Sequence, residues 1–275
     1  MTIEELIVYG KKYTSSSHAK MLLADLLKKN TLELLTILNQ EVEEDIEKMY
    51  KKMIIALKEG QPLQYVIGNV SFYGAKFKVD PRVLIPRFES EELCEKTLAY
   101  MNQKEKYPYR VLDLGTGSGV LGLTLKRLYP WCEVTLVDIS SSALELAKEN
   151  AASLNLEATF ILSDWLDNIP LQKFDIVISN PPYLKENEKI DEIVKNNEPH
   201  LALYGGKDGL DCYKKIFSKL PLYLNNFYFL AFEIGCDQKE ALLKLAEQNF
   251  QLASCFVEKD LQSRNRMLFV KSKYD

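Results

Sequence analysis

The sequence predicts an α/β protein with a doubly wound, mostly parallel sheet, preceded by a small helical domain and a β-hairpin linker. From residue 110 onward, short apolar runs alternate with helical patterns, which is typical of a parallel sheet with helices on both faces. Residues 1 to about 60 instead contain leucines at helical spacing and very few glycines or prolines. The change in pattern divides the chain into regions of different architecture.

The first hundred residues predict a helical bundle over 1–62, followed by a hairpin linker and connecting helix over 63–100. Serines 15–17 precede an apolar helical stripe, and Thr31 is the expected N-cap of a short leucine helix. Apolar residues within 43–58 lie on one face of a helix and should form core. Two β-rich runs around Gly74 predict the hairpin.

The remaining residues, 101–275, predict the α/β domain. Such sheets bind ligands beyond the carboxyl ends of their strands, where the strand order reverses. The expected strands cover 111–114, 133–138, 159–162, 174–179, 228–234, 252–257 and 267–271, with helices after Gly119 and over 141–154, 209–220 and 238–249.

Composition narrows the classes of function. The 275 residues are 47% hydrophobic and 27% charged, which is typical of a globular protein, and the net charge of −4 argues against nonspecific nucleic-acid binding. Five widely spaced cysteines without a Cys-x-x-Cys pair, and two distant histidines, predict free thiols and no metal site. No apolar stretch has membrane length and the N-terminus is acidic, so we expect a cytoplasmic protein without a membrane partner.

A glycine-rich loop indicates a nucleoside-containing cofactor. Residues 113–119, Asp-Leu-Gly-Thr-Gly-Ser-Gly, connect the first strand of the sheet to a helix, and Asp138 ends the next strand, where a carboxylate can bind ribose hydroxyls. Residues 117–122 also match the dinucleotide pattern G-x-G-x-x-G. Asp113 favours S-adenosylmethionine over NAD. A carboxylate here would attract the ammonium group of S-adenosylmethionine, whereas it would repel the pyrophosphate of NAD.

Asp164 and Trp165 follow the third strand of the sheet. This position flanks the adenine in such a fold, so Asp164 is expected to accept a hydrogen bond from the exocyclic amine and Trp165 to pack on the ring. The alternative for Trp165 is that it fills the core.

Asn180-Pro181-Pro182-Tyr183 follows the fourth strand directly. Two prolines remove N–H donors and stiffen the backbone, which leaves the Asn180 side-chain oxygen and the Pro181 carbonyl as acceptors. Together with the flat ring of Tyr183, these acceptors suit a planar –NH₂ group on an sp² carbon. The motif therefore predicts methyl transfer to an amide or amino nitrogen, with catalysis by positioning and by acceptor dipoles.

The sequence resembles the release-factor glutamine methyltransferases, the PrmC/HemK family, over nearly its whole length. The resemblance implies a Rossmann-like doubly wound methyltransferase sheet. The Asn-Pro-Pro-Tyr motif is shared with methyltransferases of DNA and RNA bases, so segments outside the sheet core narrow the choice. The matching segments are 64–68, 83–89, 111–119, 138–140, 163–165, 179–183, 198–203, 208–210, 233–235 and 260–266.

The resemblance implies methyl transfer from S-adenosylmethionine, with S-adenosylhomocysteine as product, to the glutamine side chain in the Gly-Gly-Gln tip of class I peptide chain release factors. The helical bundle would then dock the release factor, and we expect a monomer that needs no direct nucleic acid. Asn180, Pro181 and Tyr183 are the expected catalytic residues. Substrate binding is expected of Asn180, Pro181, Pro182 and Tyr183, and cofactor binding of Gly115, Thr116, Gly117, Ser118, Gly119, Asp138, Asp164, Trp165 and Asn180.

Two other functions stay open at this point: a base-amino methyltransferase of DNA or RNA, and a non-catalytic module that keeps the cofactor for structure. Ser90 stands where the family usually has Thr, and Gln262 and Ser263 where Gly is common.

Four charged residues also have two interpretations each. Arg87 and Glu89 either order the linker over the cofactor pocket or form an interdomain salt bridge. Arg264 and Arg266 either meet a phosphate or the release factor, or cap the sheet.

Overall fold

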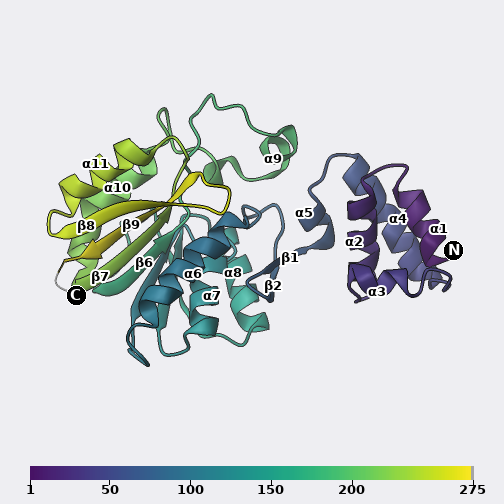
Figure 1. The fold of residues 1–275 in the computed structure, drawn as a ribbon, viewed down its shortest axis with the longest axis horizontal. Coiled ribbons are helices and arrows are strands. Elements are labelled where there is room, and N and C mark those ends of the chain that lie inside the picture. Colours follow the sequence, from purple (N-terminus) through teal and green to yellow (C-terminus); the bar gives the residue numbers. More distant parts are fainter. Residues whose placement is uncertain (274–275) are drawn as a thin grey trace. The chain divides into compact units, whose positions relative to one another are not determined.

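The computed structural model describes residues 1–273, which form two compact units (Figure 1). The first unit contains Met1–Val70 together with Ile190–Asn197, and the second contains the remaining described residues from Ser71 onward. The hairpin and the helix after it therefore belong mainly to the same unit as the large sheet.

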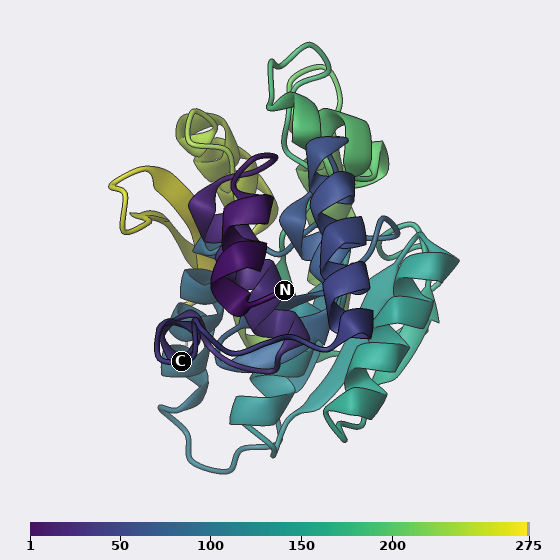
Figure 2. The same ribbon diagram turned by 90° about the vertical axis from the view of Figure 1, so that its right-hand side faces the viewer.

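The first unit is a bundle of short helices (Figure 2). Side chains cap the N-termini of the first three of them. Ser15 caps the second helix by accepting the N–H of His18 at 3.1 Å. The N-cap of the third helix is Asn30, not Thr31, because the Asn30 side chain and Glu33 form a reciprocal capping box. The helices are α1 (Ile3–Gly10), α2 (Ser16–Leu26), α3 (Thr31–Leu35), α4 (Glu44–Lys58), α5 (Leu63–Ile67) and α9 (Glu192–Asn197).

The core of this unit comes from the apolar faces that the helical spacing predicts. Leu22 and Leu23 are fully buried, as is Tyr50, whose hydroxyl donates to the Ala19 carbonyl at 3.2 Å. In α9, the Asn197 amide donates to the Gly60 carbonyl at 3.0 Å, and this contact ties the distant segment to the bundle.

The second unit is built on a seven-stranded sheet in the order β5-β4-β3-β6-β7-β9-β8. Strands β3 to β7 pair in parallel, and β9 is antiparallel to both of its neighbours. The strands are β3 (Arg110–Leu114), β4 (Glu133–Asp138), β5 (Thr159–Leu162), β6 (Phe174–Ser179), β7 (Leu224–Glu233), β8 (Ala253–Lys259) and β9 (Asn265–Ser272). The predicted doubly wound, mostly parallel sheet is confirmed.

Helices cover both faces of the sheet (Figure 1). One side carries α6 (Glu89–Met101), α7 (Val120–Leu128) and α8 (Ser141–Ser153), and the other carries α10 (Asp211–Lys219) and α11 (Lys239–Asn249). The small hairpin pairs β1 (Asn69–Phe72) with β2 (Ala75–Lys78), and the 3₁₀ helices are η1 (His200–Ala202) and η2 (Leu220–Tyr223).

The chain winds outward in both directions from the adjacent strands β3 and β6, so their carboxyl ends form the topological switch point. At α7, Gly122 allows the helix to pack closely on the sheet, because a Cβ there would come within 3.0 Å of the Val134 side chain. Among residues 1–273, no helix combines the length and apolar character needed to cross a membrane.

Candidate active site

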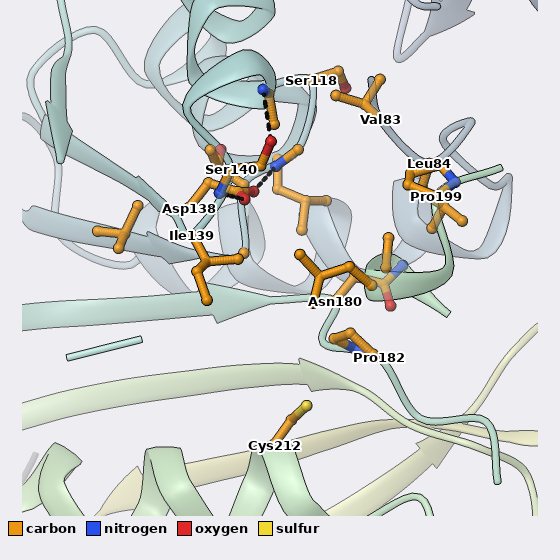
Figure 3. A pocket seen from close by; sticks show the side chains of 18 of the residues that line it. Val83, Leu84, Ser118, Asp138, Ile139, Ser140, Asn180, Pro182, Pro199 and Cys212 are labelled. Atoms are coloured by element: carbon orange, nitrogen blue, oxygen red, sulfur yellow. Dashed lines mark hydrogen bonds between the residues drawn. The ribbon is translucent and has the colours of Figure 1, made fainter. Parts of the chain in front are cut away.

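A cavity of about 290 Å³ opens at the switch point of the sheet, inside the second unit (Figure 3). The carboxyl ends of β3, β4, β5 and β6, with the loops that follow them, contribute the predicted site residues that line this cavity. They lie together because the carboxyl ends of parallel strands meet at the same edge of the sheet. The predicted site residues that line it are Gly115, Thr116, Gly117, Ser118, Asp138, Asp164, Trp165, Asn180 and Pro182.

The glycine loop supplies backbone to the wall of the cavity. Gly115 and Gly117 have φ values of +67° and +54°, a region that side chains disfavour, so the turn needs glycine at both positions. A Cβ on Gly115 would also lie 3.2 Å from the Trp165 ring. Gly119 is the N-cap of α7 and packs on Leu123, outside the lining of the cavity.

Asp138 holds this loop from the neighbouring strand. One of its carboxylate oxygens accepts the Gly117 N–H at 2.8 Å and the other accepts the Ser140 N–H at 2.9 Å (Figure 3). Burial raises the pKa of this carboxyl, while the backbone N–H groups oppose the rise. Each oxygen keeps a second lone pair, so the side chain can still accept hydrogen bonds from a ligand.

Asp113 does not play the predicted role at the cavity wall. Its carboxyl is fully buried beneath the loop and is not among the residues that line the cavity. One oxygen accepts the Thr116 hydroxyl at 2.6 Å and the Gly122 N–H at 2.9 Å, while the other has no hydrogen-bond partner. Burial raises the pKa of Asp113 to about 7. Here the carboxyl joins the glycine loop to α7.

Asp164 and Trp165 line the cavity after β5, as expected from their sequence position. The Asp164 carboxylate lies 3.4 Å from Nζ of Lys215, which also lines the cavity. Trp165 has a φ of +51°, an uncommon conformation for a bulky residue that often marks a functional constraint. Its ring packs on the core and also borders the cavity, so the core interpretation is supported and the contact with adenine stays a prediction.

The Asn-Pro-Pro-Tyr segment begins where β6 ends. The Ser179 hydroxyl donates to the Leu114 carbonyl at 2.6 Å and thereby joins the ends of β6 and β3. Asn180 and Pro182 then line the cavity, whereas Pro181 is buried and outside its lining (Figure 3). Tyr183 lies outside the lining as well.

The hydroxyl of Tyr183 lies in a buried polar cluster. It donates to the Glu233 carboxylate at 3.4 Å and accepts from the Arg266 guanidinium at 3.5 Å. The guanidinium carbon is 5.9 Å from the centre of the tyrosine ring, in cation–π range. Burial raises the pKa of Tyr183 and keeps its hydroxyl protonated.

Arg87 forms a salt bridge with Glu198, which joins the predicted linker (63–100) to the predicted α/β domain (101–275) within the second unit. The guanidinium lies 2.7 Å from one oxygen of the buried Glu198 carboxylate, and the other oxygen accepts the Ile85 N–H at 3.1 Å. The pair thus anchors the connector around Val83 and Pro86, which lines the cavity. This agrees with the interpretation that Arg87 orders the linker at the pocket.

The other charged residues have different surroundings. Glu89 lies close enough to raise the pKa of Glu233 by its charge. The Arg266 side chain is 11% exposed and donates to the Ile234 carbonyl at 3.1 Å. Arg264 contributes its backbone N–H to Asp260 in the turn between β8 and β9.

Several residues of the cavity lining were not among the predicted site residues. Ser90, Pro199, Leu201, Tyr204, Cys212 and Lys215 come from α6, from the segment after α9 and from α10. Of these, Ser90 lay in a recognised motif, whereas Cys212 and Lys215 lie on an ordinary amphipathic helix that carries no local signal. The described residues contain no cluster of three or more side chains suited to a metal ion.

The sheet order, the glycine loop and the Asn-Pro-Pro-Tyr segment define a methyltransferase-type α/β domain. Residues 94–206 match the family model for the methyltransferase small domain. The fold is similar to that of a methyltransferase from Pyrococcus furiosus, with a TM-score of 0.54 and 16% identity over 73% of this chain and 90% of that one.

Within this class, the chain belongs to the release factor glutamine methyltransferase family. It is 39% identical to the release factor glutamine methyltransferase of Bacillus cereus over 92% of this chain and 91% of that protein. The relative of the same name from Streptococcus pneumoniae is 37% identical over 99% of this chain and 96% of its own length. Residues 12–68 match the PrmC N-terminal domain.

Proposed function

We propose that this protein transfers a methyl group from S-adenosylmethionine to the side-chain nitrogen of the glutamine in the Gly-Gly-Gln motif of peptide chain release factors. The observation that carries the proposal is the position of Asn180, a hydrogen-bonding carboxamide at the end of β6 that lines the same cavity as the glycine loop and Asp138. Relatives that share this architecture over almost their whole length are named for that activity.

The cavity fits S-adenosylmethionine, which supplies an electrophilic methyl group on a sulfonium. The two left-handed glycines bring backbone to the wall without side chains in the way. The Asp138 carboxylate is the acceptor for ribose hydroxyls, and Trp165 supplies an aromatic wall beside Asp164. These residues, together with Thr116, Ser118 and the other predicted binding residues, support the cofactor assignment by the chemistry of their donors and acceptors.

The Asn180 segment supplies the acceptors for the substrate. A glutamine carboxamide carries two N–H donors on a planar nitrogen, and the Asn180 side-chain oxygen and Pro181 carbonyl are the proposed acceptors. Amide nitrogen is a weak nucleophile because its lone pair is delocalised. The residues therefore act by fixing the nitrogen in line with the methyl group and by stabilising the positive charge that develops on it. Tyr183 stiffens this corner from behind, through Glu233 and Arg266.

The helical first unit is the proposed docking domain for the release factor. The protein is proposed to act as a monomer, and to do so in the cytoplasm, where release factors work. No nucleic acid is required for the reaction at the cavity.

Mass spectrometry tests the proposal directly. The protein is incubated with S-adenosylmethionine, a release factor carrying Gly-Gly-Gln, and an equimolar oligonucleotide. A gain of one methyl on the glutamine is expected, and a release factor with Gln replaced by Glu should gain none. Methylation of the oligonucleotide alone would transfer the assignment to a base-amino methyltransferase, and no methylation of either would favour a non-catalytic module.

A further inference from the structure

A chain of buried polar groups stands behind Asn180. Nδ2 of Asn180 donates to the Ser90 hydroxyl at 3.3 Å, and the Ser90 hydroxyl donates to a carboxylate oxygen of Glu233 at 2.5 Å. Ser90 is 2% exposed and Glu233 is 1% exposed. The three residues come from α6, the end of β6 and the end of β7, so the chain is a product of the tertiary fold.

Hydrogen counting sets the direction of this chain. A serine hydroxyl has one hydrogen, and an ionised carboxylate only accepts. Because the Ser90 hydrogen points to Glu233, the Ser90 oxygen must accept from Asn180. The carboxamide of Asn180 then presents its NH₂ group to Ser90 and its Oδ1 on the opposite side. A rotation of 180° would place Oδ1 against a hydroxyl oxygen that has no hydrogen left to donate.

The environment of Glu233 comes from four elements. Ser90 and Glu89 face it from α6, the Tyr183 hydroxyl reaches it from the segment after β6, and Arg266 lies on β9. The Tyr213 hydroxyl of α10 donates to its backbone carbonyl at 2.6 Å. Arg266 lowers the pKa of the Glu233 carboxyl by its positive charge, whereas burial and Glu89 raise it.

We propose that Ser90 and Glu233 are positioning residues that hold the Asn180 carboxamide with Oδ1 toward the substrate. The inference rests on the proposed function, since the reacting group is taken to be a glutamine –NH₂. In this orientation Asn180 offers an acceptor to the substrate's N–H groups; in the reversed orientation two NH₂ groups would face each other. The hydroxyl is the part of residue 90 that the mechanism needs.

The test compares Ser90→Ala with Ser90→Thr and with a matched control, Thr97→Val. Thr97 lies on the same helix, is equally buried and donates only to the Leu93 carbonyl of its own helix. For a Gly-Gly-Gln peptide, Ser90→Ala should lower kcat/KM about tenfold or more, mainly in kcat, as expected for an unsupported acceptor. Ser90→Thr should retain activity within about threefold of wild type, and Thr97→Val should match wild type.

Two readouts are independent of turnover. Titration calorimetry with S-adenosylhomocysteine should show that Ser90→Ala still binds this ligand, with a change in affinity much smaller than the loss in kcat, since Ser90 and Asn180 both line the cavity. In protein labelled with ¹⁵N at asparagine, the side-chain NH₂ signals of Asn180, assigned with Asn180→Asp, should shift in Ser90→Ala and stay in place in Thr97→Val. Any of three results for Ser90→Ala would overturn the proposal. These are unmoved Asn180 signals, activity equal to that of Thr97→Val, and a loss of S-adenosylhomocysteine affinity as large as the loss in kcat.

Glu233→Gln gives a second, independent arm. Protonation of Glu233 at low pH turns one of its oxygens into an O–H donor, so the Ser90 hydrogen is no longer fixed toward Glu233. Wild-type kcat/KM should therefore fall as pH drops through the pKa of this carboxyl. Glu233→Gln, checked for folding by thermal unfolding, should lack this fall in kcat/KM at low pH. A pH profile of Glu233→Gln equal to that of wild type would contradict the inference. If wild type fails to methylate a release factor carrying Gly-Gly-Gln, the proposed function fails, while the Asn180 signals still report the orientation.

Discussion

The carboxylate of Asp138 accepts the backbone N–H of Gly117 at 2.8 Å across 21 residues of sequence. This bond joins the end of β4 to the glycine loop after β3 and holds the loop in its left-handed turns. It explains how two short motifs on adjacent strands form one wall of the cavity.

We therefore expect Asp138→Ala to weaken S-adenosylmethionine binding by about 10- to 100-fold, since both a ligand acceptor and the loop anchor are lost. Titration calorimetry measures the effect. Asp175→Asn is the matched control: Asp175 is also buried, but it bonds Arg110 and Asn225 away from the cavity lining. Equal affinities for wild type and Asp138→Ala would remove Asp138 from the site.

Asn180→Ala should reduce methylation of a Gly-Gly-Gln peptide by at least about a hundredfold, because the positioned side-chain acceptor disappears. Single-turnover mass spectrometry provides the rate, and circular dichroism checks the fold. Asn249→Ala, on α11 with its amide bonded to Leu245 of the same helix, should behave as wild type. Turnover that survives in Asn180→Ala would contradict the assigned role.

Arg87→Met should lower the free energy of unfolding by about 1–3 kcal/mol, because it leaves the buried Glu198 carboxylate without its cation. The double variant Arg87→Met/Glu198→Gln should recover part of this loss, since no uncompensated charge remains. Urea denaturation measures all of these values. Lys96→Met, which breaks the exposed pair with Glu258, should cost about 1 kcal/mol or less, and a similar cost for Arg87→Met would show that burial of Glu198 is unimportant.

Asp113 should make stability depend on pH. Burial raises its pKa from 3.8 to about 7, so the folded state binds its proton more tightly than the unfolded state. The contribution of this proton to the free energy of unfolding is fully present below pH 3.8, the pKa of the carboxyl in the unfolded state. It is lost as the pH rises toward 7, and the loss is no more than about 4 kcal/mol. Asp113→Asn should show a smaller decline in unfolding free energy between pH 4 and pH 7. Identical slopes for the two proteins would refute this assignment.

The sequence by itself determined the features that depend on neighbouring residues. Strand and helix patterns follow from periodicity, so the order of elements in the second unit and the strand 174–179 could be predicted directly. The glycine loop and Asn180-Pro181-Pro182-Tyr183 could also be read, because their backbone chemistry is local. The N-cap at Asn30 was missed by one residue because several polar residues there can cap a helix.

Only the tertiary structure decided which distant groups meet. Asp113 stands beside the glycines in sequence, yet its carboxyl turns under the loop toward Gly122, because α7 packs closely on the sheet there. Ser90, Glu233 and Arg266 have no local pattern that links them to Asn180. Glu233 and Arg266 meet because β6, β7 and β9 are adjacent in the sheet, and Ser90 joins them from α6, which packs on β7. Strand order arises from long-range pairing and burial, which sequence spacing does not encode, and it is strand order that places these side chains behind Asn180.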